Sequence, residues 1–327
     1  MPELPEVQTI VSDLEILIGQ QFVDFFSGAP KALKNISLAS FAKEITGQKI
    51  KSVSRLGKII LIRLVNNKTI AIHLKMTGKL ILTDHKTWNI EHKAWNVERE
   101  IWNIEHGARN MEREIWNIEH GTQNINHKKN TINNPGIVDR EPRTIPKHLH
   151  HIFFLKNKVL KFYDVRKFAT ISLLDDTDLA TIKNNYGIDP ITDTFSLKQF
   201  FALIMRGKAR KIKEILMHNT LILGIGNIYA SEILFDARIL PARKADSLSE
   251  KELKLLHKSI TKILRKAIKM RGTSISDYRD ANDKSGSFQN QLFVYRRGGQ
   301  ACKKCGTIIL RSVIAQRSTF FCAKCQH

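Results

Sequence analysis

The stretch Leu223-Gly-Ile-Gly-Asn-Ile-Tyr-Ala-Ser-Glu232 is the most specific fold signal in this 327-residue chain. Gly224 and Gly226 precede Asn227, and this pattern predicts a turn because glycine adopts backbone angles that other residues avoid. Such a turn also brings backbone N–H groups toward an anion, so it suits a phosphate contact as well as a purely structural role. The stretch therefore predicts a tight turn that can face a phosphate.

The residues on both sides of this stretch have a helical pattern. From about residue 195, apolar residues recur three and four positions apart, at Phe200, Leu203, Ile204, Ile212, Ile215 and Leu216. A long helix is predicted around 249–270, because Ser249 and Glu252 form the capping-box pattern at its start. We therefore expect a helical domain over residues 185–296.

The first part of the chain is predicted to be mostly strand. Residues 7–18 have apolar side chains at helical spacing and predict one amphipathic helix. Short β-branched runs then dominate residues 22–84 and resume at 151–163. Runs of this length with glycine and asparagine between them are typical of an antiparallel sheet. We expect a sheet domain built from residues 1–84 and 141–184.

All four cysteines lie near the end of the chain, in Cys302-Lys-Lys-Cys305 and Cys322-Ala-Lys-Cys325. Two C-x2-C knuckles at this separation predict one tetrahedral zinc site with four thiolate ligands. Two disulfides are the alternative, but they fit poorly with a chain that lacks an export signal. The runs 307–313 and 318–321 between the knuckles are β-prone, so residues 297–327 are predicted to form a zinc-clipped hairpin.

The composition narrows the class of partner. Lys and Arg number 53 against 31 Asp and Glu, which gives a net charge of +22. This excess favours a polyanion such as nucleic acid, because binding releases counterions from the phosphates. A membrane surface is the competing polyanion, but no apolar run approaches the ~20 residues of a spanning helix. The acidic start is unlike a signal peptide, so a cytoplasmic protein is expected.

Residues 85–140 interrupt the predicted sheet with a repeat. All four tryptophans fall on a seven-residue grid, at Trp88, Trp95, Trp102 and Trp116. The apolar residues are two apart rather than three and four, which excludes a coiled coil. We interpret the segment as a disordered surface insertion, since a long loop costs little extra entropy. A Trp- and His-lined binding arm is the functional alternative. Removing residues 86–129 is expected to leave the fold and the activity close to wild type.

The N-terminus begins Met1-Pro2-Glu3-Leu4-Pro5-Glu6. Loss of the initiator Met exposes the secondary amine of Pro2. Its attack on an aldehyde-like carbon gives a cationic iminium, an electron sink for elimination chemistry. Glu3 and Glu6 can supply protons or hold charge nearby. The structural alternative is an N-terminus that simply begins a helix, since proline suits the first helical turn.

Outside the insertion, the chain resembles the formamidopyrimidine-DNA glycosylases, bacterial base-excision enzymes that remove oxidised purines. Several motifs carry the resemblance in this order and spacing: Pro2-Glu-Leu-Pro-Glu-Val7, Arg55-Leu-Gly-Lys58, His73-Leu-Lys-Met-Thr-Gly78, Asp164-Val-Arg-Lys-Phe168, Leu223–Glu232, Arg271-Gly-Thr-Ser, and the cysteine ribbon with Ala315-Gln-Arg317. The resemblance implies an α+β multidomain fold: an N-terminal β-sandwich with flanking helices, a helix–two-turn–helix domain that includes a lesion loop, and a C-terminal four-Cys zinc ribbon.

The resemblance also implies catalytic roles. Pro2 is expected to form a Schiff base at the sugar C1′, and Glu3 to protonate the opening sugar ring or the departing base. Lys58 is expected to assist proton transfer and to bind phosphate. Arg317 is expected to hold a phosphate and to aid the second elimination. The implied activity is that of a DNA glycosylase and an abasic-site lyase with one structural zinc.

The remaining implied residues contact double-stranded DNA. Met76, Arg166 and Phe168 are expected to fill the space that a flipped-out base leaves, with Arg166 facing the orphaned cytosine. His148, Lys208, Lys213 and Asn227 are expected to hold phosphates. The protein is expected to act as a monomer, with no membrane partner.

The sequence departs from the family pattern at some positions in these motifs, among them Lys75, Val165, Lys167, Ala169, His218 and Ser287. The loop around Val165 is therefore expected to be less rigid. Two alternatives stay open. The endonuclease VIII branch removes oxidised pyrimidines, but it typically begins Pro-Glu-Gly-Pro-Glu, and Leu4 argues against it. A non-catalytic descendant would bind lesion DNA and cleave nothing.

Overall fold

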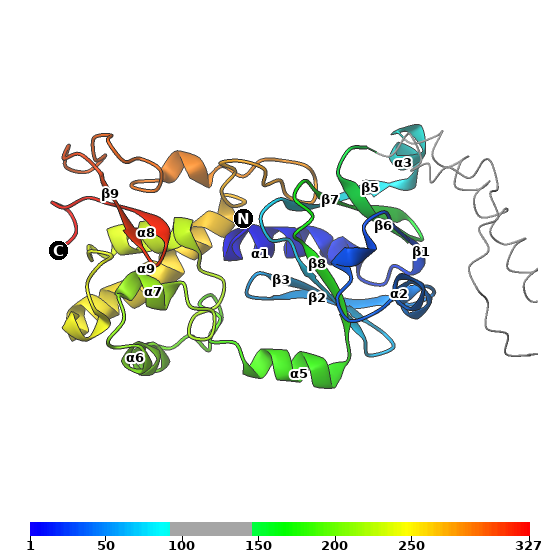
Figure 1. Ribbon diagram of the computed structural model, residues 1–327, viewed down its shortest axis with the longest axis horizontal. Coiled ribbons are helices and arrows are strands. Elements are labelled where there is room, and N and C mark those ends of the chain that lie inside the picture. Colours follow the sequence, from blue (N-terminus) through cyan, green and yellow to red (C-terminus); the bar gives the residue numbers. More distant parts are fainter. Residues whose placement is uncertain (92–145) are drawn as a thin grey trace, which may run out of the picture.

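A computed structural model describes residues 1–91 and 146–327, which form two lobes with the N-terminus between them (Figure 1). The first lobe is a sandwich of two four-stranded antiparallel sheets, as the sequence predicts. One sheet has the order β1-β6-β7-β5, with bounds Phe22–Ser27, Leu149–Leu155, Lys158–Asp164 and Gly78–Asp84. The other has the order β2-β3-β4-β8, with bounds Ile50–Leu56, Ile59–Leu64, Thr69–His73 and Thr170–Leu174.

The core of this lobe lies between the two sheets and under the first helix. Ile60, Ile62 and Leu64 alternate along β3 and are fully buried, as period-two patterning requires. Helix α1 (Leu4–Leu14) adds one apolar stripe to the same core, made by Val7, Ile10, Val11 and Leu14. The helix thus binds the N-terminal residues to the sandwich. Helix α2 (Leu38–Ile45), which the sequence analysis did not predict, covers one end through Phe41 and Ile45.

The second lobe is helical. After α5 (Asp176–Asn184), it comprises α6 (Leu197–Arg206), α7 (Ile212–Leu216), α8 (Asn227–Asp236) and α9 (Glu250–Lys269), packed around a separate apolar core. The predicted capping box is confirmed, because the Ser249 hydroxyl accepts from the Glu252 N–H and the Glu252 carboxylate accepts from the Ser249 N–H. Short 3₁₀ turns are η1 (Glu15–Leu17), η2 (Pro30–Ala32), η3 (Ala245–Ser247) and η4 (Phe288–Gln291).

The chain ends in the predicted hairpin. Strands β9 (Leu310–Ile314) and β10 (Arg317–Phe321) pair through a two-residue turn. Both turn residues are left-handed, with φ of 47° at Ala315 and 57° at Gln316. This geometry matches the twist of the strands. Arg317 therefore leaves a tight turn at a set angle.

The predicted insertion differs from expectation at its start. Residues His85–Glu91 form helix α3, and Trp88 is buried against the outer face of the first sheet. Its ring packs edge-on against the Phe154 ring, with 5.7 Å between the ring centroids. The expectation of a disordered loop is therefore wrong for these seven residues, because one tryptophan has an apolar site to fill. The rest of the predicted insertion, with its other tryptophans, lies outside the described residues. Within the described ranges, no helix is long and apolar enough to span a membrane.

Candidate functional site

Glu3 is held at the N-terminus of α8, more than two hundred residues away in sequence. Its carboxylate accepts N–H groups from Gly226 and Ile228, each at 2.9 Å, and from Tyr229 at 3.3 Å. The first N–H groups of a helix lack partners within the helix and favour an anion. The turn predicted at residues 224–227 thus binds a carboxylate of the chain itself. This contact joins the two lobes at the N-terminus.

Glu6 lies one helical turn further and is also buried. Its carboxylate accepts the Glu3 N–H at 2.8 Å, the Tyr229 hydroxyl at 2.5 Å and the Thr273 N–H at 2.7 Å. Burial, followed by the nearby charge of Glu3, raises the pKa of Glu6 to about 7. Glu6 can therefore gain or lose a proton near neutral pH.

Pro2 and Lys58 lie near Glu3 and Glu6, and we call these four residues the centre. Pro2 is buried and lines a cavity together with Glu6, Met76 and Tyr278. Lys58 is also buried, and its ammonium donates to the Ile225 carbonyl at 3.2 Å. Burial lowers the pKa of Lys58, while the charges of Glu3 and Glu6 act in the opposite direction. Two acids, a buried lysine and the N-terminal proline thus converge, as the sequence prediction requires.

Three residues predicted to enter the DNA duplex form one exposed cluster. Met76 is 47% exposed and Phe168 is 54% exposed, although both are apolar. The Arg166 guanidinium lies over the Phe168 ring at 5.0 Å and contacts the Met76 sulfur at 3.1 Å. Exposed apolar side chains that gather around one residue mark an interaction surface more often than isolated ones.

Asp164 holds the loop that carries this cluster. Its buried carboxylate accepts the Thr77 hydroxyl, the Arg166 N–H at 3.2 Å and the Ala169 N–H at 2.8 Å. These bonds fix both ends of the loop despite the departures at Val165, Lys167 and Ala169. Lys75 and Lys167 are left-handed, with φ of 52° and 55°, where glycine is favoured. His148 is half-buried and left-handed, and its carbonyl accepts the Asp164 N–H.

The other predicted phosphate contacts differ in exposure. Lys208 and Arg317 are exposed. Lys213 is only 1% exposed and donates to the Thr319 hydroxyl at 2.7 Å and to the Ser318 carbonyl at 3.4 Å. Burial lowers the pKa of Lys213 to about 8. Lys213 therefore has a contact with the ribbon that the prediction did not include.

Asn227 contacts the same strand of the ribbon. Its Nδ2 donates to the Ser318 carbonyl at 2.9 Å, while its buried Oδ1 has no hydrogen-bond partner. Arg317, the preceding residue, lies close enough for its charge to lower the pKa values of Lys58 and Lys213. The ribbon thus presents Arg317 toward the centre.

The four cysteines form the predicted metal site. Their sulfur atoms all lie within 4.8 Å of one another, and all four residues are free thiols. Four sulfurs about 2.3 Å from a tetrahedral zinc would lie roughly 3.8 Å apart. The Cys302–Cys325 pair is at 4.0 Å and the Cys305–Cys322 pair at 3.4 Å. The thiols fit one structural zinc, which holds both knuckles together.

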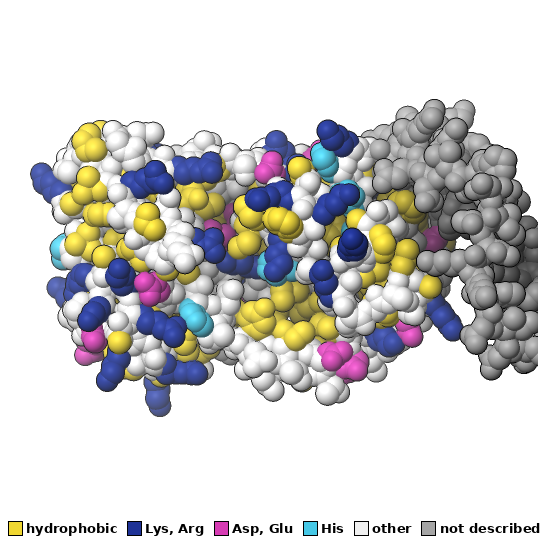
Figure 2. Space-filling view, viewed as in Figure 1, with side chains coloured by type: hydrophobic (Ala, Val, Ile, Leu, Met, Phe, Trp, Pro, Cys, Tyr) yellow, Lys and Arg dark blue, Asp and Glu magenta, His cyan; other side chains and the backbone are white. Residues whose placement is uncertain are grey.

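The charge of the surface agrees with the composition. Lys and Arg side chains are spread over both lobes, with few Asp or Glu among them on the face in Figure 2. Two remaining departures make polar contacts: the Ser287 hydroxyl donates to the Met270 carbonyl, and the His218 ring bonds the Thr220 hydroxyl.

Two residues of α8 make buried contacts that the sequence did not predict. Tyr229 stands in the quoted Leu223–Glu232 stretch, but only the fold brings its hydroxyl to Glu6. Glu232, in the same stretch, accepts three successive N–H groups, those of Phe293, Val294 and Tyr295. The available signal was an acidic residue, Glu232, followed directly by the apolar run Ile233-Leu-Phe235.

Comparison with known proteins identifies the family domain by domain. The formamidopyrimidine-DNA glycosylase N-terminal domain matches residues 1–171, and the corresponding H2TH domain matches residues 186–279. A zinc finger found in Fpg and isoleucyl-tRNA synthetase (IleRS) matches residues 299–327. The three matches follow the lobes and the ribbon.

Full-length relatives and solved structures point to the same family. The chain is 35% identical to the formamidopyrimidine-DNA glycosylase of Herpetosiphon aurantiacus and 33% identical to that of Carboxydothermus hydrogenoformans, with 100% of each chain covered. It is also similar to a solved complex of the Lactococcus lactis Fpg with DNA containing an abasic site, at 30% identity, a TM-score of 0.74 and 99% coverage of both chains. A second complex of that protein contains Fapy-dG DNA and has a TM-score of 0.73. With these matches over its whole length, the chain belongs to the formamidopyrimidine-DNA glycosylase family of DNA-repair enzymes.

Proposed function

We propose that this glycosylase removes oxidised purines, 8-oxoguanine and formamidopyrimidines, from double-stranded DNA and then cleaves the abasic site as a lyase. We also propose that it acts as a monomer. The supporting observation is that Pro2 and Glu6 line one cavity, while Glu3 and Lys58 lie close enough for their charges to interact with Glu6. Pro2 as a nucleophile, with Glu3 and Glu6 nearby to transfer protons, suits a reaction that both forms a covalent bond and moves protons.

The first step forms the covalent intermediate. After Met1 is removed, the lone pair of the Pro2 nitrogen attacks C1′ of the sugar. The N-glycosidic bond breaks, and the base leaves with the bonding electrons and takes up a proton, which balances the N–H proton that the Pro2 nitrogen gives up. Glu3 protonates the ring oxygen as the C1′–O4′ bond opens, which leaves a cationic iminium. Lys58 assists these proton transfers.

The second stage cleaves the strand. Loss of a proton from C2′ drives the β-elimination that expels the 3′-phosphate, with the iminium as electron sink. Loss of a proton from C4′ then drives a δ-elimination, aided by Arg317, that expels the 5′-phosphate. Water hydrolyses the remaining bond to Pro2 and frees the enzyme.

Access to C1′ requires the damaged nucleotide to leave the base stack. The exposed cluster of Met76, Arg166 and Phe168 is suited to fill the gap, with Arg166 toward the opposite cytosine. Asn227, His148, Lys208, Lys213 and Arg317 hold phosphates around the lesion. The exposure of Lys208 and Arg317 supports contacts beyond the chain.

Oxidised pyrimidines are a second candidate substrate class. One solved structure similar to this chain is a complex of the Lactococcus lactis Fpg with DNA that contains an oxidised pyrimidine. The cavity at Pro2 includes Met76, Ile275 and Tyr278, side chains that can pack against either base type. Dihydrouracil therefore belongs in the substrate set that tests the proposal.

The test is borohydride trapping on duplexes with 8-oxoguanine, dihydrouracil or an abasic site. We expect a covalent adduct on the Pro2 nitrogen, located by mass spectrometry, and nicking of the 8-oxoguanine strand. A short N-terminal extension that blocks Met removal should abolish trapping but keep DNA binding, while the same extension at the C-terminus should change neither. An adduct on a lysine with Pro2 unmodified would overturn the nucleophile. Binding without nicking or trapping would indicate the non-catalytic alternative.

A further inference from the structure

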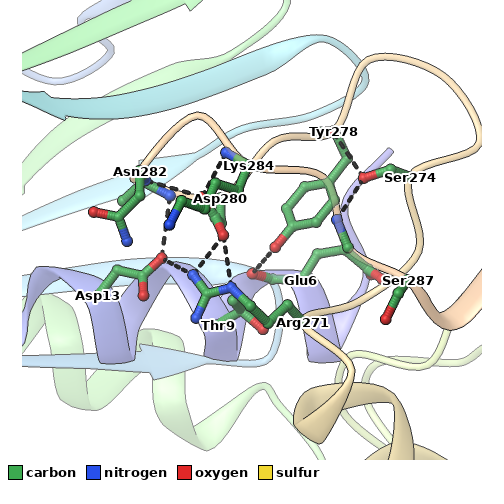
Figure 3. A network of polar contacts seen from close by, with 12 residues as sticks. Glu6, Thr9, Asp13, Arg271, Ser274, Tyr278, Asp280, Asn282, Lys284 and Ser287 are labelled. Atoms are coloured by element: carbon green, nitrogen blue, oxygen red, sulfur yellow. Dashed lines mark hydrogen bonds and ion pairs between the residues drawn. The ribbon is translucent and has the colours of Figure 1, made fainter.

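One face of α1 contacts the segment that follows α9. Glu6, Thr9 and Asp13 are three, four and seven positions apart and so share that face. They all lie toward residues 271–287, which leave α9 and return beside it (Figure 3). We call residues 273–287 the returning loop. Its contacts with α1 bring the two lobes together at the cavity beside Pro2.

The strongest of these contacts is a clamp made by Arg271. Its Nη2 donates to the Asp13 carboxylate at 2.6 Å, and its Nε donates to the Asp280 carboxylate at 2.6 Å. Asp280 is fully buried and Asp13 is only 10% exposed. A guanidinium that pairs with two nearly buried carboxylates is far more constraining than a surface ion pair.

Each carboxylate of the clamp also holds backbone of the returning loop. Asp13 accepts the Ala281 N–H at 3.2 Å, while the other oxygen of Asp280 accepts the N–H groups of Asn282 and Lys284, both at 2.9 Å. Arg271 itself is left-handed, with φ of 59°, where the chain leaves α9. The clamp thus determines the path of the loop at its middle and its end.

The start of the loop forms one wall of the cavity. Residues 275–278 line it from the loop side, and Pro2, Glu6 and Met76 line it from the other lobe. The loop is closed internally by Ser274, whose hydroxyl donates to the Tyr278 carbonyl at 2.9 Å and accepts the Gly286 N–H at 3.0 Å. A shift at the clamp is therefore transmitted to the cavity wall by a short, bonded loop.

We propose that the Asp13–Arg271–Asp280 clamp sets the position of the returning loop against Pro2, so that Arg271 is a positioning residue for recognition of the base to be removed. This inference rests on the proposed function. The sugar reacts at Pro2, just before α1, whereas the base extends into the cavity that the loop closes. An abasic site has no base to hold, so its cleavage does not depend on the loop wall.

The test uses the full-length protein with Arg271→Gln. It compares a duplex that contains 8-oxoguanine with a duplex that contains a preformed abasic site. We expect kcat/KM for 8-oxoguanine excision to fall by about ten- to a hundredfold, because small misplacements of a binding wall have effects of that size. Cleavage of a preformed abasic site should stay within about twofold of wild type, because the misplaced wall has no base to contact there. Arg271→Lys keeps the charge, so its kcat/KM for 8-oxoguanine excision should lie between the values of wild type and Arg271→Gln.

Hydrogen exchange gives an independent readout of the loop. In Arg271→Gln, the peptides covering Thr273–Lys284 should exchange faster, since the Ala281, Asn282 and Lys284 amides depend on the clamp carboxylates. Arg243→Gln is the matched control, because Arg243 makes a two-pronged pair with Glu252 at the opposite end of α9. It should leave both the substrate ratio and the exchange of the loop unchanged.

Equal losses on the two duplexes would overturn the inference, because the clamp would then only stabilise the fold. Unchanged excision in Arg271→Gln would overturn it as well. Both results would leave the proposed function standing, since wild-type protein would still cleave. A wild-type protein that cleaved neither duplex would instead remove the proposed function and this inference together.

Discussion

Gly226 has no side chain where Glu3 needs room: a Cβ atom built at Gly226 would lie 2.3 Å from the carboxyl carbon of Glu3 and 2.4 Å from one of its oxygens. The Glu3 carboxylate lies close against the backbone at the start of α8 and accepts the Gly226 N–H at 2.9 Å. The glycine is therefore required for the approach of the two lobes, and not only for the turn.

Gly226→Ala should displace Glu3 and reduce base excision by about a hundredfold, the effect expected for a misplacement of roughly 1 Å. Gly28→Ala is the control, because its Cβ would meet nothing nearer than 3.7 Å. Single-turnover excision of 8-oxoguanine is the measurement. Full activity in Gly226→Ala would show that Glu3 does not need its place at α8.

Glu3→Gln should slow base excision more than cleavage at a ready-made abasic site, since only excision must eject a base. The amide keeps the size of the side chain but cannot donate the proton proposed for Glu3. Parallel kinetics on 8-oxoguanine and abasic duplexes measure the difference. Equal reductions on both substrates would argue against that proton-transfer role.

Glu6 should make the protein less stable as the pH rises. Its pKa is about 7 when folded, against 4.5 for the ordinary side chain. Between these values the unfolded chain releases the proton while the folded chain keeps it, so the free energy of unfolding falls from pH 4.5 to 7. The full effect is at most about 3 kcal/mol.

Denaturant unfolding at pH 5 and pH 8 measures this contribution. Glu6→Gln should flatten the difference between the two pH values, whereas Glu15→Gln, at an exposed position of the same N-terminal region, should not. An unchanged pH dependence in Glu6→Gln would assign the effect to another group.

Cys322→Ser should release the zinc and weaken DNA binding, because metal binding supplies much of the folding energy of such small ribbons. The hairpin that carries Arg317 contacts Lys213 and Asn227, so its loss also disturbs the centre. Ala323→Ser is the matched control, since it adds the same hydroxyl one residue along and removes no ligand. Zinc content and the affinity for an abasic duplex are measured. Wild-type affinity in a zinc-free protein would contradict the prediction.

Trp88→Ala should destabilise the protein by about 3–5 kcal/mol, the usual cost of emptying a buried aromatic site. Lys86→Ala, on the exposed side of α3, should have little effect. A deletion of residues 92–129 should therefore be better tolerated than one of residues 86–129, which also removes Trp88. Thermal unfolding compares all four variants. Equal stability of the two deletions would show that the Trp88 site contributes nothing.

Local patterns in the sequence predicted much of the fold. The capping box of Ser249 and Glu252, the β-branched run that forms β3 and the cysteine knuckles each depend on neighbours within a few residues. The prediction was wrong at α3, because the repeat itself does not show that Trp88 meets an apolar site. That site lies on β6 and β7 and is built from distant residues.

The sequence by itself determined which groups are present: the proline that can become an N-terminal amine, the acids beside it, the four thiols and the excess of positive charge. The tertiary structure decided which of them meet. It placed Glu3 at the start of α8, buried Lys213 against the ribbon and closed Arg271 on Asp13 and Asp280. Except for the Arg271–Asp280 pair, which is nine residues apart, these contacts span more than a hundred residues. They depend on how the lobes and the ribbon pack, and no local periodicity or spacing records them.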